Sequence, residues 1–467
     1  MTSYPIKSLL CLAVLTLTAC SDNDSKDTPE PTYITEFNAD FSQSSSDWHA
    51  GFADYPKGGE NEWELTATPN QSFNLTDNTS AAGFYLHSSN RSDDTQMFIT
   101  KRLVNLKPNT FYDVAFYVQI ATNINDQCAG IGGSPHSVTV KAGLSQQQPT
   151  TTLDELNHYR LNLDFGNQVQ GGLDGISLGD IAAPDLSDCD PGSDVYTYKT
   201  LKNTKQNFEV ATSSNGELWL TLLTDSGFEG ITSIYFTSVN VEFSESEKTA
   251  SGFTESIDFS QPQLDVNPLF FDYPAARPFD WELTARPQTN VKDIDGEVIS
   301  GYLLHSYNRS DDTGMLLHKP IKGLLNNTQY QADFNVTIAT NVNNQCFGIG
   351  GAPHAVAVKA GISNAMPEAI LPESDNHLRL NVDFGNNMRG SDNAVVLGDI
   401  GEESLADCDP SSDIYALKQF DSKQINESVT FTTDNSGVIY FSVFTDSGFE
   451  GATTMLFTEA SVTFTKL

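Results

Sequence analysis

The chain has 467 residues, of which 61 are acidic against 25 Lys and Arg, and its formal net charge at pH 7 is −36. A negative charge of this size opposes binding to nucleic acid and to anionic lipid, and it favours neutral or cationic glycans over polyanionic ones. The length fits two domains of roughly 200 residues each, and no segment after the first twenty residues is apolar enough to cross a membrane.

The N-terminus has the composition of an export signal. Lys7 precedes an apolar run, Leu9 to Leu17, that is too short to span a bilayer. Leu17-Thr18-Ala19-Cys20 resembles the lipobox of bacterial lipoproteins, in which the signal is removed before the Cys and the Cys is lipid-modified. The resemblance implies a signal peptide at residues 1–19, acyl chains such as palmitate on Cys20, and, because Ser21 follows, the outer membrane of a Gram-negative bacterium. The alternative is an ordinary secretion signal.

A polar segment with two prolines and no apolar period follows at residues 20–32, and we expect a disordered tether there. After it, the stretch His158–Asn167 returns at His377–Asn386 with most of its residues unchanged. Matches continue along both copies with small insertions, which indicates one ancestral domain that was duplicated. The predicted domains are residues 33–246 and 255–467, joined by a linker at residues 247–254.

Short alternating segments separated by Gly, Asn, Asp and Pro predict strands, and helical periodicity is nearly absent. These segments are Trp63–Ala67, Tyr112–Ile120, Val138–Ala142, Tyr159–Phe165 and Leu218–Thr224. The spacing favours an all-β fold with two tandem antiparallel β-sandwich (jelly-roll) domains.

Two segments of each copy carry a family resemblance. They are Leu106–Val118 and Ile231–Phe243 in the first copy, and Leu324–Val336 and Ala452–Phe464 in the second. Their turn-and-strand patterns resemble those of galactose-binding-like, carbohydrate-binding jelly rolls. The resemblance implies a jelly-roll fold and a carbohydrate ligand, although such patterns specify a fold better than a ligand.

One polar strand face is retained in both copies. Alternation directs Tyr159, Leu161, Leu163 and Phe165 to the core and the residues between them to the other face. The polar residues are His158, Arg160, Asn162 and Asp164, which recur as His377, Arg379, Asn381 and Asp383. The outward face of Tyr112–Ile120, by contrast, shares no residue with its second copy. We therefore expect the retained polar face to contact a ligand, with an internal polar network under a loop as the alternative.

The cysteines and an acidic loop also recur. Cys128 with Cys189, and Cys346 with Cys408, give one matched pair per copy, which predicts one disulfide per domain in an oxidising compartment. Carboxylates cluster beside the second cysteine of each pair, at Asp188, Asp190 and Asp194 and at Asp407, Asp409 and Asp413. Clustered oxygens predict a calcium site, and an Asx-rich turn is the alternative.

Two further patterns concern sugar ligands. Tyr55 and Tyr273 lie in repeated Asp-Tyr-Pro loops and are expected to be exposed platforms for sugar rings. Lys141-Ala142-Gly143 resembles a strand of jelly-roll alginate lyases, although the flanking aromatic residues and a nearby Gln-x-His are missing. A lyase or hydrolase would use His158 or His377 as a base and Arg160 or Arg379 to neutralise a substrate carboxylate.

The sequence leaves three hypotheses about function. The first is a non-catalytic lipoprotein, anchored in the cell envelope, whose two modules bind an extracellular polysaccharide or another polymer with avidity. The second is a polysaccharide-degrading enzyme that uses the polar face. The third is a calcium-dependent adhesion or assembly protein whose partners are other envelope proteins.

Overall fold

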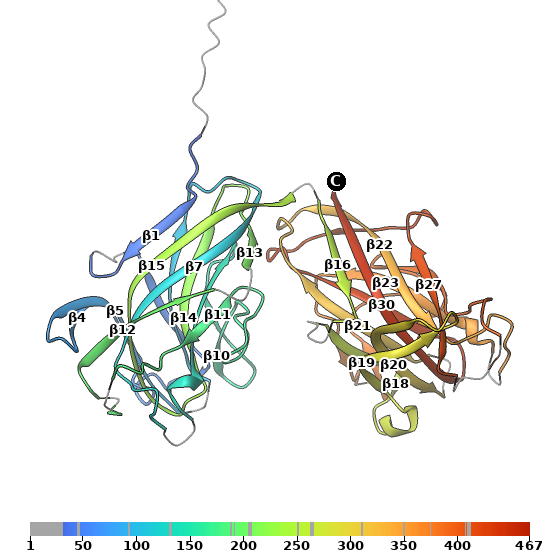
Figure 1. Ribbon diagram of the computed structural model, residues 1–467, viewed down its shortest axis with the longest axis horizontal. Coiled ribbons are helices and arrows are strands. Elements are labelled where there is room, and N and C mark those ends of the chain that lie inside the picture. The colour runs from blue at the N-terminus through green and yellow to red at the C-terminus, as the bar shows by residue number, and fades with distance from the viewer. Residues whose placement is uncertain are drawn as a thin grey trace, which may run out of the picture. The chain divides into compact units, whose positions relative to one another are not determined.

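The protein is described here from a computed structural model, which covers residues 31–43, 47–91, 94–129, 133–186, 189–190, 192–203, 208–249, 252–261, 266–309, 312–348, 351–373, 375–406, 408 and 412–467. The expected signal peptide and Cys20 lie outside these residues. Within them, no helix is long and apolar enough to cross a membrane. The described chain is all-β apart from short 3-10 helices, and its large sheets fall into two halves (Figure 1).

Within its described residues, the first half contains fifteen strands and one 3-10 helix. Their bounds are β1 Glu36–Asp40, β2 His49–Ala53, β3 Tyr55–Pro56, β4 Thr66–Leu75, β5 Ser80–Asn90, β6 Gln96–Leu103, β7 Thr110–Thr122, η1 Pro135–Ser137, β8 Val138–Ser145, β9 Thr151–Leu153, β10 His158–Leu161, β11 Ile176–Asp180, β12 Val195–Lys202, β13 Phe208–Ala211, β14 Leu218–Ser226 and β15 Gly230–Thr249.

The second half follows the same order, with one more 3-10 helix. Its elements are β16 Thr254–Asp258, β17 Asn267–Phe271, β18 Tyr273–Pro274, η2 Pro278–Trp281, β19 Thr284–Asp293, β20 Val298–Asn308, β21 Gly314–Ile321, β22 Gln329–Thr340, η3 Pro353–Ala355, β23 Val356–Ser363, β24 Ala369–Ile370, β25 His377–Leu380, β26 Ala394–Asp399, β27 Ile414–Asp421, β28 Val429–Thr432, β29 Ile439–Ser447 and β30 Gly451–Lys466.

Each half forms three sheets. In the first half the orders are β1-β15-β5-β4-β12-β7-β13, β11-β8-β14-β6-β2 and β3-β10-β9. The second half repeats them as β16-β30-β20-β19-β27-β22-β28, β17-β21-β29-β23-β26 and β18-β25-β24. Pairing is antiparallel throughout the named strands except for a short parallel contact between β12 and β4, and between β27 and β19.

The core of each half lies between the seven-stranded and the five-stranded sheet. In the first half, alternate residues of β7 from Tyr112 to Ile120 are at most 4% exposed, and they belong to one apolar cluster with Val138 of β8 and Leu220 of β14. The second half builds the same kind of cluster around Phe334. The strands expected at Tyr112–Ile120, Val138–Ala142 and Leu218–Thr224 are therefore confirmed.

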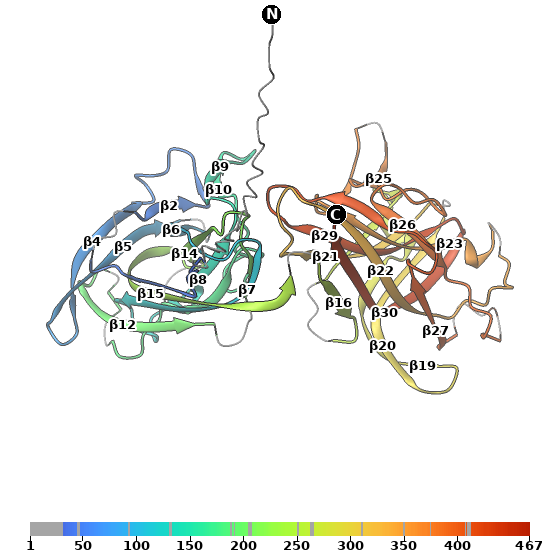
Figure 2. The ribbon, with the colours of Figure 1, turned by 90° about the horizontal axis from the view of Figure 1, so that it is seen from above.

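The expected strand Tyr159–Phe165 is only half formed. β10 ends at Leu161, and the chain then bends, because the Asp164 carboxylate accepts the backbone N–H of Gly166 at 2.8 Å and of Leu173 at 3.0 Å. The apolar residues of the expected strand are still buried. Leu163 and Phe165 pack with Phe98 on the outer face of the five-stranded sheet. Figure 2 shows β9 and β10 on the side of β6 and β14 away from β15.

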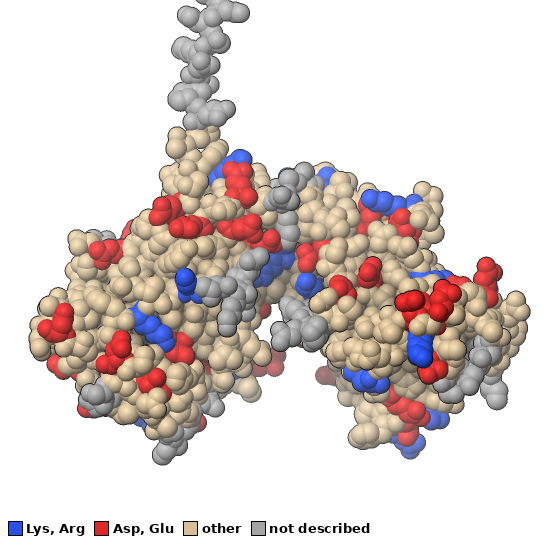
Figure 3. Space-filling view, viewed as in Figure 1, with Lys and Arg blue, Asp and Glu red and all other residues tan. Residues whose placement is uncertain are grey.

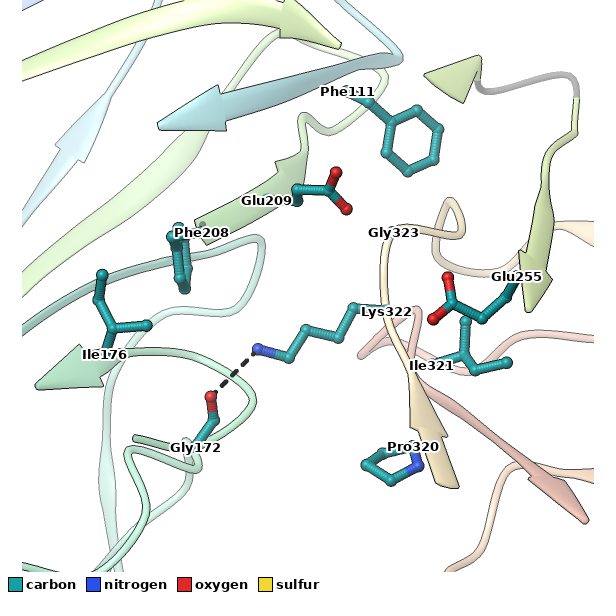
Figure 4. Close-up of a pocket in the computed structure, with 10 residues that line it drawn as sticks. All are labelled: Phe111, Gly172, Ile176, Phe208, Glu209, Glu255, Pro320, Ile321, Lys322 and Gly323. Carbon is teal, nitrogen blue, oxygen red and sulfur yellow. Dashed lines mark hydrogen bonds between the residues drawn. The ribbon is translucent and has the colours of Figure 1, made fainter. Parts of the chain in front are cut away.

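The second half begins with β16, which pairs with β30 along Thr254 to Asp258. Glu255 of β16 forms an ion pair with Lys319 of β21 at 3.0 Å. Figure 4 draws Glu255 together with the end of β21 at Pro320 and Ile321 and the following turn. Gly323 in that turn has a φ of +96°, a left-handed conformation that favours glycine.

Both expected disulfides are present. Cys128 bonds to Cys189 with 5.4 Å between the Cα atoms, and Cys346 bonds to Cys408 with 5.6 Å. The prediction of one disulfide per copy is confirmed, which agrees with an oxidising, extracellular or envelope compartment.

Candidate functional site: two arginine-centred carboxylate clusters

Arg160 is the centre of a charged cluster on the three-stranded sheet of the first half. It lies on β10, which pairs with β3 on one side and β9 on the other. Its Nε donates to Asp154 at 2.9 Å, its Nη1 donates to Asp54, and Asp94 lies 3.7 Å from Nη1. Three carboxylates thus surround one guanidinium whose side chain is 41% exposed. We name these four residues the Arg160 cluster.

The second half contains the same arrangement, the Arg379 cluster. Arg379 contacts Asp375 at 2.7 Å, Asp272 at 2.8 Å and Asp312 at 3.2 Å. Each cluster draws its carboxylates from three separate segments and has a formal charge of −2, from three carboxylates and one guanidinium. Acidic side chains are also scattered over the visible face of both halves (Figure 3).

The innermost carboxylate of each cluster has an unusual backbone and an unusual pKa. Asp54 has a φ of +60° and Asp272 a φ of +59°, a region that non-glycine residues seldom adopt. Burial raises the pKa of Asp54 to about 6, against the lowering effect of the hydrogen bond from Arg160. Burial raises the pKa of Asp272 to about 6 in the same way. In both clusters the inner carboxylate therefore takes up a proton at a higher pH than an ordinary aspartate does.

The outer carboxylates are shifted in the opposite direction. Hydrogen bonds from Arg379 and His377 lower the pKa of Asp375 to about 2. The pKa of Asp154 is also lowered, chiefly by the backbone N–H of His158 and then by Arg160. Each cluster therefore combines an ionised outer carboxylate with an inner one that can hold a proton.

A buried ion pair lies beneath the segment that follows β10. The Nζ of Lys141 donates to Asp225 Oδ2 at 2.8 Å and to the carbonyls of Phe165 and Gly166 at 2.9 and 3.2 Å. Both charged side chains are 0% exposed, and Asp225 Oδ2 also accepts the backbone N–H of Gln168 at 2.9 Å. The pair therefore fixes the bent segment to the sheet. The charge of Asp225 also contributes to the raised pKa of Asp54.

The equivalent pair in the second half is Lys359 with Asp446. Their atoms lie 2.8 Å apart, and Asp446 Oδ2 accepts the backbone N–H of Asn387 at 2.7 Å. Sequence reasoning did not find either pair. Two features of the sequence could have indicated these pairs. A lysine interrupts an apolar strand in both copies, and the segment Thr-Asp-Ser-Gly-Phe-Glu-Gly, which contains the partner Asp, is identical in both copies.

The predicted polar face divides into two groups. Asn162 accepts the N–H of Thr150 at 2.8 Å and donates to the Gln148 carbonyl at 3.0 Å. Asn381 repeats this bonding with Glu368 and Met366, and Asp383 caps Gly385 as Asp164 caps Gly166. These bonds to nearby backbone give the two Asn and the two Asp a structural role, but all four residues are exposed, and their contact with a ligand stays a prediction. The arginines are the members that face charged partners at a partly exposed surface.

The histidines of this face are half-buried. His158 Nδ1 is buried and has no hydrogen-bond partner within the described residues. His377 Nδ1 lies 3.1 Å from the Asp375 carboxylate. His158 and His377 therefore have different surroundings although the sequence repeats them, and contact of either ring with a ligand stays a prediction.

The expectation that Tyr55 is exposed is wrong. It is 8% exposed, because β3 pairs with β10 and the Tyr55 ring lies 5.0 Å from the Tyr159 ring. Tyr273 is half-buried on β18. Tyr55 therefore lacks the open face that stacking on a sugar ring requires, whereas stacking on Tyr273 stays a prediction.

Three of the six predicted calcium ligands, Asp190, Asp194 and Asp413, lie within the described residues. Asp188, Asp407 and Asp409 lie outside them. Asp190 accepts the N–H of Gly192 at 2.9 Å, which is the hydrogen bond of an Asx turn. Asp194 and Asp413 lie directly before β12 and β27. In the part of the chain that the structure covers, no group of three or more His, Cys, Asp or Glu is arranged to hold a metal ion. Calcium at the full loop stays a prediction.

Comparison with known proteins gives no family for the chain. No family model matches, and no curated protein matches. Among solved structures, a candidate sugar binding protein from Bacteroides thetaiotaomicron is 10% identical with a TM-score of 0.23, covering 47% of this chain and 97% of its own. A Paenibacillus xanthan lyase is 11% identical with a TM-score of 0.21, and the match covers 86% of this chain and 25% of the lyase. The extracellular domain of ANXUR1 from Arabidopsis thaliana is 9% identical with a TM-score of 0.18, and the match covers 86% of this chain and 97% of that domain. The chain thus spans about a quarter of the length of the xanthan lyase. Scores this low specify neither fold family nor function.

Proposed function

We propose that the protein is a non-catalytic lipoprotein of the bacterial cell envelope that binds an extracellular glycan through two duplicated jelly-roll domains. The lipid anchor on Cys20 rests on the lipobox resemblance, and an outer-membrane location rests on Ser21. Duplication is supported by the identical strand order of the two halves and by their repeated side-chain clusters.

The observation that carries the proposal is the partly exposed Arg-centred cluster that occurs twice. A guanidinium holds three carboxylates in fixed positions, and fixed carboxylates are strong acceptors for sugar hydroxyls. Asp54 and Asp272 keep a left-handed backbone in both halves, a strain that proteins concentrate at functional sites. The cluster charge of −2 favours neutral or cationic sugars over uronates.

The same geometry argues against a lyase. The lyase hypothesis assigns Arg160 to neutralising the carboxylate of a uronate, but Arg160 is already bonded to Asp54 and Asp154. A uronate placed there would meet a cluster with excess negative charge, which costs binding energy. Arg379 is bonded to the equivalent residues of the second half, Asp272 and Asp375. We therefore assign the two arginines to holding carboxylates, not to binding an anionic substrate.

The test removes one carboxylate charge from each cluster, at the Asp that has the longest contact with its arginine. We expect Asp94→Asn combined with Asp312→Asn to weaken retention on neutral polysaccharide in affinity electrophoresis by about tenfold, because a hydrogen bond to a charged group contributes about 1.5–3 kcal/mol. The matched control is Asp185→Asn with Asp295→Asn, which changes the net charge equally at exposed positions elsewhere. If both double variants bind as the wild type does, the clusters are not the glycan site.

A further inference from the structure

A polar groove crosses the outward face of the seven-stranded sheet in the second half. Its lining comes from four adjacent strands, β16, β30, β22 and β27. The lining residues that present polar side chains are Ser256, Asp258, Asn335, Thr337, Gln419, Glu459 and Ser461. This groove is separate from the Arg379 cluster, which lies on the three-stranded sheet.

The strand register arranges these side chains in two rows across the sheet. One row runs Gln419, Thr337, Glu459 and Asp258, and the next runs Asp421, Asn335, Ser461 and Ser256. Neighbouring strands lie about 4.8 Å apart, close to the length of one pyranose unit. A glycan chain laid across the strands therefore meets a new pair of hydrogen-bonding groups at each sugar.

The groups in the groove are available for a ligand. Within the described residues, the side chains of Asn335, Gln419 and Glu459 form no hydrogen bond with the rest of the chain, whereas Asp258 is bonded to Ser260 and Gln261. Amides and carboxylates in this mixture suit sugar hydroxyls, which both donate and accept. Asp258 and Glu459 in the first row disfavour a polyanionic chain.

The first half has a different surface at the same positions. Tyr117, which is 39% exposed, stands where the second half has Asn335, and next to the groove positions Tyr198, which is 42% exposed, stands where the second half has Leu417. Asn240, the counterpart of Ser461, is bonded to Asn38. The row that contains Asn335 and Ser461 is therefore not repeated in the first half, and duplication alone does not account for it.

We propose that this groove is a second glycan site, which takes a neutral polysaccharide chain running across β27, β22, β30 and β16. The inference rests on the proposed function and adds a binding surface to it. In this site Gln419, Asn335 and Glu459 form hydrogen bonds with the sugar hydroxyls. The glycan chain runs parallel to the two rows of side chains.

The test compares a groove variant with a matched control. Gln419→Ala with Glu459→Ala removes an amide and a carboxylate from the groove, and Gln345→Ala with Glu403→Ala removes the same groups from exposed positions elsewhere. The probes are a β-glucan, a galactomannan and a xylan, with alginate as the polyanionic probe, in isothermal titration of the full chain. Melting temperature checks folding, and Asn335→Ala provides a milder second variant.

We expect the groove variant to bind its best neutral probe about tenfold more weakly, Asn335→Ala about threefold more weakly, and the control as the wild type does. Wild-type binding of alginate stronger than of every neutral probe overturns the inference. Unchanged binding by both groove variants, while Asp94→Asn with Asp312→Asn is impaired, overturns the second site and keeps the proposed function. Absence of wild-type binding to every probe overturns both.

Discussion

Replacement of Lys141 by Met tests how the buried ion pair holds the candidate site in place. The variant leaves the Asp225 carboxylate without its cation at a position that is 0% exposed. It also removes the donor from the carbonyls of Phe165 and Gly166. Breaking a buried pair on one side costs about 3–5 kcal/mol, a large part of the roughly 5–15 kcal/mol that stabilises a typical domain.

The second partner provides the internal control. Lys141→Met with Asp225→Leu removes both charges, so the double variant should be at least about 2 kcal/mol more stable than the sum of the two single variants predicts. It should stay below the wild type, because the N–H of Gln168 and two carbonyls lose their partner.

Urea unfolding followed by tryptophan fluorescence measures these energies. The first half contains Trp48, Trp63 and Trp219, whereas the second contains Trp281, so the signal reports mainly on the half that carries the substitution. Lys359→Met is the parallel variant in the second half, where Asp446 is the partner. A loss below about 1 kcal/mol in Lys141→Met, or additive effects in the double variant, would refute the reasoning.

Two further predictions follow from the clusters and the N-terminus. Burial raises the pKa of Asp54 and Asp272 to about 6, so between about pH 4 and 6 the folded state holds protons that the unfolded chain has already released. The free energy of unfolding should therefore fall as the pH rises through this range. Asp54→Asn with Asp272→Asn should flatten this slope in thermal melts at several pH values, and an unchanged slope would contradict the raised pKa values. Cys20→Ser should move the protein from the membrane fraction to the soluble fraction and abolish labelling with radioactive palmitate; continued labelling would remove the lipobox assignment.

The sequence predicted the features that depend on local pattern. Alternation located β7, β8 and β14, and the matched cysteines located both disulfides. It also identified Arg160 as the residue to examine, because the residue recurs as Arg379 on a retained face.

Features that depend on distant partners were missed or misjudged. Tyr55 is buried because Tyr159, far along the chain, lies over it. β10 is shorter than expected because a carboxylate at its end bonds the backbone of a later turn. Three segments bring carboxylates to Arg160, and the pair between Lys141 and Asp225 joins residues 84 apart in the sequence. Alternation within one strand carries no information on such contacts.

Hydrogen–deuterium exchange with and without a saturating neutral polysaccharide tests most directly whether the Arg clusters meet the ligand. Slower exchange in peptides that contain β3 with β10, and β18 with β25, is the result expected of two glycan sites built on the three-stranded sheets. Binding that leaves exchange in these four strands unchanged would contradict that assignment.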